Sequence, residues 1–224
     1  MSSPLKAVLF DVDGTLVDSN DAHAQAWVKA FTEHGVTVDA AQVRRCIGMG
    51  GDKLMPKVSG LDEDSPQGSA IGKRRGEIFT QEFLPALKAF RDSARLVGAV
   101  KERRLTAVAA SSAKKDELKA LLKIAGADAL MDALTSSDDA EDSKPDPDII
   151  QAALKRTKAS PSEALMIGDT PYDIEAASRA GVKTIAFRSG GWSDSDLKGA
   201  IDIYDGPWDL LAKIDHSPLG RIKT

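Results

Sequence analysis

The stretch LKAVLFDVDGT, residues 5–15, decides the fold, because a short apolar run ends there in two acids and a glycine. We predict a buried strand over residues 5–10 from their mostly apolar character. Residues two apart on an extended backbone point the same way, so Asp11 and Asp13 leave the strand on one side. Gly14 permits a tight turn after them, and Thr15 offers a hydroxyl and an amide N–H to an anion.

The closeness of these two acids predicts a bound cation. Two carboxylates so near each other would raise one pKa sharply unless a cation holds both ionised. Mg²⁺ fits, because it prefers oxygen ligands and shares its coordination among carboxylates, waters and a substrate phosphate. A solvated hairpin turn does not fit, since no alternating strand follows Gly14. The glycine also comes too early for the calcium loop of an EF-hand.

Length and composition define the broad class of the protein. A chain of 224 residues can bury a sizeable core, as one large domain or as a domain with an insertion. The net charge of −4 and a pI near 5.5 give no field that would attract nucleic acid or an anionic membrane. The single cysteine, Cys46, excludes an internal disulfide and is expected to be a buried helical thiol. We find no membrane span and no signal-peptide core, and we expect a cytoplasmic protein.

Short strands and helices alternate in the second half of the chain. We predict strands over residues 105–110, 129–134, 164–167, 183–187 and 201–204, and helices over 113–125, 147–157, 171–180 and 207–214. This alternation predicts an α/β fold, a doubly wound, Rossmann-like parallel sheet with helices on both faces. The polar tail, residues 217–224, is expected to be disordered.

A helical insertion separates the first two predicted strands. Residues 11–104 lie between them, whereas a simple βαβ unit needs only roughly thirty residues. A first helix is expected over residues 21–34, capped by a residue from 18–20. We therefore predict a catalytic α/β core formed by residues 1–19 and 89–224, and a smaller, all-helical cap domain over residues 20–88.

Polar residues that follow the later strands are further candidates for a site. In open parallel sheets, ligands bind at the carboxyl ends of the strands. Ser111 and Ser112 follow the strand 105–110, and we expect Ser112 to cap the next helix while Ser111 binds phosphate with the helix N–H groups. Asp169 and Asp173 follow the strand 164–167. We expect Asp169 to be a metal ligand and Asp173 to be a ligand or an outer support.

Lys144 is a candidate for phosphate binding. Two prolines, at positions 145 and 147, stiffen the backbone beside it, and the second suits the start of a helix. A lysine held in this way can serve as a point charge for a phosphate group.

Together these motifs resemble those of the haloacid dehalogenase superfamily of phosphotransferases. The resemblance rests on Asp-x-Asp-Gly-Thr at the first strand, a serine after the second, a downstream Lys-Pro and a Gly-Asp-x-x-x-Asp. The helical insertion resembles the C1-type cap of that superfamily. Asp18-Ser19 with His23 and Trp27 resembles the branch that holds phosphoglycolate phosphatases and β-phosphoglucomutases.

The resemblance implies a role for each matching residue. Asp11 would be the nucleophile that forms an aspartyl-phosphate, and Asp13 the general acid and base. Mg²⁺ would be held by Asp11, Asp169 and the backbone carbonyl of Asp13, while Lys144 and Ser111 complete the phosphate clamp. The implied partner is a small phosphorylated metabolite, with no nucleic acid and no membrane, and the chain would be a monomer or a weak homodimer.

Three other functions share part of this pattern. A phosphosugar mutase has the same core motifs and His23, so cap residues must decide. We expect substrate contacts from His23 and from the groups 48–53 and 73–75, which contain Lys53 and Arg74. In phosphonoacetaldehyde hydrolases a Schiff-base lysine lies near a Met-Gly, as Lys53 does here, but no apolar surroundings lower its pKa. A nonenzymatic phospho-ligand sensor would gain nothing from the acid pair at 11 and 13.

Overall fold

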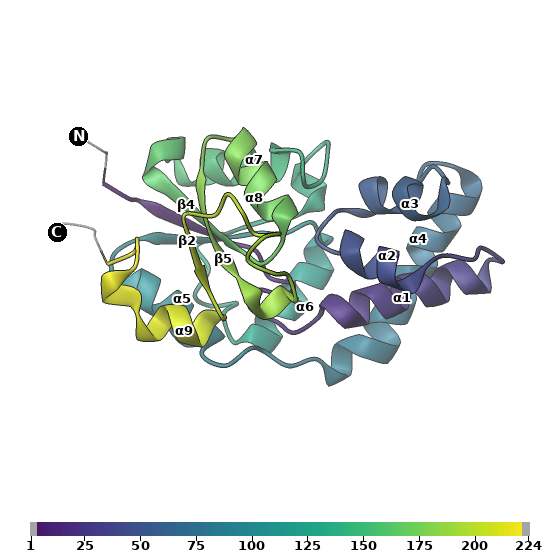
Figure 1. Ribbon diagram of the computed structural model, residues 1–224, viewed down its shortest axis with the longest axis horizontal. Helices are drawn as coiled ribbons and strands as arrows, with labels where there is room; N and C mark the ends of the chain where they lie inside the picture. Colours follow the sequence, from purple (N-terminus) through teal and green to yellow (C-terminus); the bar gives the residue numbers. More distant parts are fainter. Residues whose placement is uncertain (1–3, 221–224) are drawn as a thin grey trace.

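The computed structural model describes residues 4–220 and has a parallel sheet at its centre (Figure 1). The six strands described lie in the order β3-β2-β1-β4-β5-β6. They are β1 (Ala7–Phe10), β2 (Thr106–Ala110), β3 (Ala133–Thr135), β4 (Ala164–Gly168), β5 (Lys183–Phe187) and β6 (Asp202–Tyr204). This order confirms the predicted doubly wound, Rossmann-like α/β fold. β2 and β3 are added on one side of β1, and β4, β5 and β6 are then added on its other side.

The register of the central strands brings the candidate site residues together. Phe10, the last residue of β1, lies beside Ala109 of β2 and Ile167 of β4. The three strands therefore end at the same edge of the sheet. The polar residues that follow them are gathered at this edge although they are far apart in the chain.

Alternate residues of β1 face two hydrophobic layers, as expected for a strand covered on both sides. Val8 and Phe10 pack with α5 (Ser93–Glu102), α6 (Lys115–Ala125) and α9 (Pro207–Ala212), while Ala7 and Leu9 pack with α7 (Asp148–Thr157) and α8 (Pro171–Arg179). Figure 1 shows α7 and α8 on one face of the sheet, and α5 and α9 on the other.

Helices occupy the segment between β1 and α5, where the sequence predicts an insertion. They are α1 (Asn20–Glu33), α2 (Ala40–Cys46), α3 (Gly51–Ser59) and α4 (Pro66–Ile78), followed by a π-helical turn and a short 3₁₀ turn that end at Ala86. Figure 1 shows α1–α4 grouped at one end of the molecule, beyond the sheet. One hydrophobic cluster continues from Phe10 of the sheet to Phe31 of α1, so the boundaries of a separate cap domain stay a prediction.

Details outside the central strands differ from the prediction. The third strand covers Ala133–Thr135 rather than residues 129–134, and α6 begins at Lys115 rather than at residue 113. Ser217 is buried and its hydroxyl donates to the carbonyl of Ile214, so the prediction of disorder is wrong for residues 217–220; residues 221–224 lie outside the described residues. Over residues 4–220, no helix has the length and apolar character needed to span a bilayer.

Candidate active site

Three buried carboxylates meet at the carboxyl edge of the sheet. Asp11 follows β1, Asp169 follows β4, and Asp173 lies in the first turn of α8. One oxygen of each lies within 4.8 Å of an oxygen of the other two. The structure therefore brings together three of the four acids that the sequence predicts as metal ligands.

Lys144 is buried among these acids. Its Nζ donates to Asp11 Oδ1 at 2.6 Å, to Asp173 Oδ1 at 2.8 Å and to the carbonyl of Ala110 at 2.8 Å. Burial alone would lower the pKa of Lys144, but the carboxylates of Asp11 and Asp173 raise it well above its ordinary value. The lysine is therefore charged, and it balances one of the three carboxylates.

The remaining negative charge suits a divalent cation. Burial raises the pKa of Asp11 well above its ordinary value; Asp173 and Asp169 raise it further, and Lys144 opposes them. Burial and the neighbouring Asp173 raise the pKa of Asp169 to about 7. Clustered oxygen ligands with excess negative charge in a dry site fit Mg²⁺ by their chemistry.

We expect Mg²⁺ to stabilise the protein more at neutral than at acidic pH. The pKa of Asp169 rises from 3.8 to about 7 on folding, so ionisation is penalised in the folded state and the metal-free protein loses stability as pH rises through this range. Asp11 acts in the same direction. Mg²⁺ needs the ionised carboxylates and binds only the native cluster, so the gain in Tm over an EDTA control should be larger at about pH 7.5 than at about pH 5. Equal gains at both pH values would contradict this.

Asp13 is separate from the carboxylate cluster. Its Oδ1 accepts a hydrogen bond from Ser19 Oγ and lies 2.7 Å from His23 Nε2. Burial acts to raise the pKa of Asp13, but His23, Ser19 and the more distant Arg75 together bring it below its ordinary value. The expectation that both strand-end acids aim at one cation is thus wrong for the side chain of Asp13, because this carboxylate is turned toward α1.

His23 is fixed in one tautomer by a neighbouring arginine. Its Nδ1 lies 2.9 Å from a guanidinium nitrogen of Arg75, which can only donate, so Nδ1 accepts and Nε2 carries the proton toward Asp13. The ring also stacks on Phe79 at a centroid distance of 4.0 Å. A second nitrogen of Arg75 donates to Glu117 Oε2 at 2.9 Å. His23 therefore orients Asp13, the residue for which the family resemblance implies a role as general acid and base.

The hydroxyl of Thr15 hydrogen-bonds to a carboxylate of the cluster. This hydroxyl donates to Asp169 Oδ1 at 2.9 Å, and the backbone N–H of Thr15 donates to the carbonyl of Val12 at 3.3 Å. Both donors are engaged within the protein and the residue is fully buried, so these contacts do not support an anion contact of Thr15, which stays a prediction. Asn20, expected with Ser19 as a helix cap, instead donates to Asp169 Oδ2 at 2.9 Å, and neither side chain caps α1.

Ser111 and Ser112 lie at the edge of the sheet as predicted, but neither caps a helix. Ser111 Oγ accepts from the N–H of Ala113 at 3.1 Å, and Ser112 Oγ is buried with no hydrogen-bond partner among residues 4–220. The capping prediction is wrong because α6 begins only at Lys115, with Lys114 as its N-cap. Both serines line the cavity described below.

The two predicted cap contacts, Lys53 and Arg74, do not reach the cavity. Arg74 pairs with Glu33 at 2.5 Å and Glu77 at 3.2 Å on the surface of α1 and α4. Lys53 pairs with Asp142 at 2.7 Å and with Asp146 at 3.1 Å. The hydrogen bonds that Lys53 donates to these carboxylates raise its pKa, which is opposite to what a Schiff-base lysine requires.

A cavity of about 620 Å³ lies over the edge of the sheet. The sheet side supplies Asp11, Asp13 and the two serines. The inserted helices supply His23, residues 47–52, Glu63, Lys73 and Arg75. Arg75 was predicted only as a member of the basic group 73–75, and Glu63 was not predicted at all.

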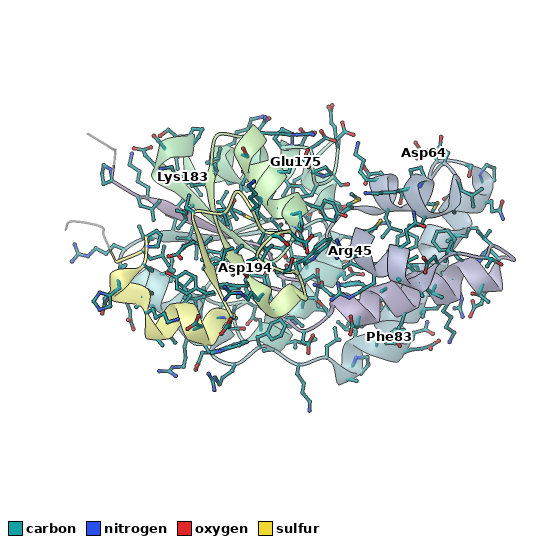
Figure 2. All side chains as sticks on the ribbon, viewed as in Figure 1. Arg45, Asp64, Phe83, Glu175, Lys183 and Asp194 are labelled. Atoms are coloured by element: carbon teal, nitrogen blue, oxygen red, sulfur yellow. The ribbon has the colours of Figure 1, made fainter. Side chains whose placement is uncertain are left out.

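Contacts on both sides of this cavity join the inserted helices to the sheet. Gly50 donates its N–H to Ser143 Oγ at 3.0 Å on one side, and Arg44 donates to the carbonyl of Gly190 at 2.9 Å on the other. Figure 2 labels Arg45 where α2 meets the sheet-bearing part of the molecule, and its guanidinium lies 4.3 Å from the ring of Trp192. These contacts hold the inserted helices against the sheet-bearing part of the molecule.

Gly14 and Gly190 leave room for the side chain of Asp169. The sequence pattern gave a reason for the first of these glycines only. At Gly14, which has a φ of 74°, a Cβ would lie 2.2 Å from Asp169 Oδ2. At Gly190 a Cβ would lie 1.9 Å from the same oxygen. The Gly-Gly pair at 190–191 after β5 is the signal that could have pointed to this close approach.

The fold and the site define a Rossmann-like enzyme with a carboxylate centre beneath helices inserted after its first strand. A family model described as haloacid dehalogenase-like hydrolase matches residues 8–187, and the chain belongs to this family. The chain is 30% identical over 191 residues to a putative pyrophosphatase PpaX of Caldanaerobacter subterraneus subsp. tengcongensis, covering 84% of this chain and 83% of the relative.

Two further similarities agree with this assignment. The phosphoglycolate phosphatase of Rhodospirillum rubrum is 29% identical over 211 residues, covering 89% of this chain and 87% of the relative. The crystal structure of a hydrolase from Pseudomonas syringae superposes with a TM-score of 0.87 at 27% identity and covers 94% of this chain and 98% of that one. The chain is therefore a haloacid dehalogenase-like hydrolase with phosphatases among its relatives.

Proposed function

We propose that the protein is a Mg²⁺-dependent phosphatase that hydrolyses a small phosphate monoester through an aspartyl-phosphate on Asp11. The observation that carries this proposal is the separation of the two strand-end acids. Asp11 lies in the carboxylate cluster against Lys144, whereas Asp13 is held by His23 at the cavity wall. This separation supports a mechanism in which one acid attacks and the other transfers a proton.

The reaction divides into two displacements. A carboxylate oxygen of Asp11 attacks phosphorus while the bond to the ester oxygen breaks, and Asp13 gives that oxygen its proton. Asp13 then takes a proton from water, whose oxygen attacks phosphorus and releases phosphate and Asp11. Because the pKa of Asp13 is lowered in this structure, the first step needs the negative charge of the bound phosphate to raise it.

Lys144 and the carboxylate cluster support both steps. Mg²⁺, held by Asp11 and Asp169 with Asp173 beside them, would supply positive charge to the phosphoryl oxygens. Lys144 stays charged throughout, because its carboxylate partners raise its pKa. The inserted helices, which line the cavity, limit the access of bulk water to the site.

A panel of esters tests this proposal. The protein with Mg²⁺ should release phosphate from p-nitrophenyl phosphate and from several metabolite monoesters, and EDTA should stop the release. A sugar-phosphate isomerisation assay run in parallel tests the mutase, which the same core motifs would also serve. Isomerisation without net phosphate release, or no release from any ester, would overturn the proposal.

Asp13→Asn should slow the reaction in a way that depends on the leaving group. Asparagine cannot transfer a proton, so we expect an alkyl phosphate to lose roughly 10²–10⁴-fold in kcat/KM. With p-nitrophenyl phosphate the first step needs no acid, and phosphorylation of the enzyme, measured as a burst in rapid-quench kinetics, should be nearly unchanged. Equal loss of the burst rate for both esters would contradict the assignment of Asp13 as the acid.

A further inference from the structure

We propose that the cavity selects an uncharged, hydroxyl-bearing leaving group, such as a sugar or cyclitol alcohol, over an anionic one. This inference rests on the proposed phosphatase function and names the class of ester that the site accepts. It is carried by the charges on the part of the cavity wall that is contributed by the inserted segment, by α6 with its N-cap Lys114, and by the loop before α7. Acidic side chains outnumber basic ones on this wall. The acidic residues are Asp52, Glu63, Asp64, Glu117 and Glu141, and the basic residues are Lys73, Arg75 and Lys114.

Arg75, the cation beside the proton donor, is already engaged. Its two terminal nitrogens donate to Glu117 Oε2 and to His23 Nδ1, each at 2.9 Å. Its Nε is buried and has no partner among the described residues. The charge of Arg75 is therefore balanced by Glu117, and the two terminal nitrogens of Arg75 are already engaged and not free for a carboxylate or phosphate on the leaving group.

Glu63 presents an unpaired carboxylate to the cavity. It is half-buried, and no hydrogen bond or ion pair of its carboxylate occurs within residues 4–220. It lies against the first turn of α3, where a Cβ on Gly51 would come within 2.6 Å of Glu63 Oε1. Burial and the nearby carboxylate of Asp52 raise the pKa of Glu63. Lys114 and Arg75 act against this shift, but neither forms an ion pair with Glu63 among residues 4–220, so an anion brought to this wall would meet like charge.

A hydroxyl group meets the same wall favourably. It can donate to the carboxylate of Glu63 in a charge-assisted hydrogen bond, whereas an ionised carboxylate or phosphate has acceptors only. Asp52 already accepts from Ser143 Oγ, so it contributes charge to the wall more than a free acceptor. Lys73 and Lys114 are exposed, as are the acids Asp64 and Glu141, so water weakens the effect of all four on an anion. The half-buried carboxylates of Asp52 and Glu63 therefore decide the charge of the wall, because Glu117 and Arg75 balance each other.

A matched pair of esters tests the inference. 2-Hydroxyethyl phosphate and 2-phosphoglycolate differ by a hydroxymethyl group in place of a carboxylate. We expect kcat/KM to be at least about tenfold higher for the hydroxyethyl ester, in keeping with the cost of like charges at a desolvated site. Pyrophosphate, whose leaving group is also anionic, should be as poor as 2-phosphoglycolate. A ratio of one or below would overturn the inference.

Two variants test whether the charges of this wall cause the preference between the two esters. Glu63→Gln should lower the ratio about threefold or more, because it removes charge and keeps shape. Glu77→Gln, a control on the surface of α4 that pairs with Arg74 away from the cavity, should leave the ratio unchanged. The inference is wrong if both variants change the ratio equally.

Binding separates failure of the inference from failure of the proposed function. Calorimetry with the Asp11→Asn variant and Mg²⁺ compares the Kd values of the two esters without any turnover. Tighter binding of 2-phosphoglycolate would overturn the inference even if the protein proved not to be a phosphatase. Absence of turnover with tighter binding of the hydroxyethyl ester would overturn only the proposed function.

Discussion

Asp11→Asn is expected to lower kcat by a factor of roughly 10⁴ or more for every ester, the largest effect of any substitution in this chain. An amide oxygen is a poor nucleophile toward phosphorus, so the covalent step is lost. The loss should be similar for every ester, because each of them must pass through the covalent step that needs this nucleophile. This uniformity distinguishes the nucleophile from the proton donor Asp13.

The fold of this variant should survive. Asparagine has nearly the size of aspartate, and its Oδ1 can still accept from Lys144, which lies 2.6 Å from Asp11 in this structure. The pKa of Asp11 is raised by burial, so a neutral side chain removes a cost that the folded protein bears at neutral pH. We therefore expect the metal-free variant to be at least as resistant to heat as the parent protein.

Acid-quenched mass spectrometry provides the direct measurement. The parent protein mixed with substrate should carry a phosphoryl group on the peptide that contains residue 11, and Asp11→Asn should carry none. Asp13→Asn serves as the control, because it keeps the nucleophile and should still become labelled by p-nitrophenyl phosphate. Turnover of Asp11→Asn within tenfold of the parent rate would show that another group attacks phosphorus.

The central sheet and the carboxylate cluster could be predicted because both follow from local patterns. Short apolar runs define the strands, and parallel strands place the residues after them at one edge. Asp11, Asp169 and Asp173 are found there, as is Ser111. Strand ends are harder to predict, and β3 covers only Ala133–Thr135 because the preceding residues form a turn before the chain enters the sheet.

The roles of Thr15, Ser19 and Asn20 could not be read from the sequence. Small polar residues before a helix usually bond to its free N–H groups, and nothing local distinguishes that use from support of a distant carboxylate. In the fold, Asp169 lies within reach of Thr15 and Asn20, and Asp13 within reach of Ser19. The carboxylates that accept these hydrogen bonds are buried and charged. A hydrogen bond to a buried charge stabilises the fold more than one to a solvated helix end does.

The difference between Arg74 and Arg75 also depends on tertiary structure. Neighbouring residues on a helix point about 100° apart, so Arg74 and Arg75 meet different surroundings. The contact of α4 with α1 decides which arginine lies at the cavity, because His23 on α1 bonds to Arg75 while Glu33 pairs with Arg74. Glu63 and Glu117 reach the cavity from segments with no local motif, so sequence alone gave no reason to name them.

Lys144→Met is expected to have the second largest effect, on both activity and stability. Lys144 is almost fully buried and binds two carboxylates. Removing one partner of a buried ion pair costs about 3–5 kcal/mol, because the remaining charges lose their compensation. Methionine keeps most of the apolar side chain, so the loss of stability comes from the missing charge more than from an empty cavity. Activity should fall by roughly 10²-fold or more for all esters alike, since this lysine faces the cluster and not the leaving group.

The pH dependence gives this prediction a sharper test. In the variant, Asp11 and Asp173 repel each other when ionised, and the raised pKa of Asp11 means that protonation relieves the repulsion as pH falls. The deficit in the free energy of unfolding, measured by urea titration in EDTA, should therefore be largest near neutral pH and smaller at about pH 5. Lys155→Met, on the exposed side of α7, is the matched control and should show neither loss. An unfolding free energy equal to that of the parent at neutral pH, or a loss of activity confined to one ester, would mean that Lys144 does not hold the cluster.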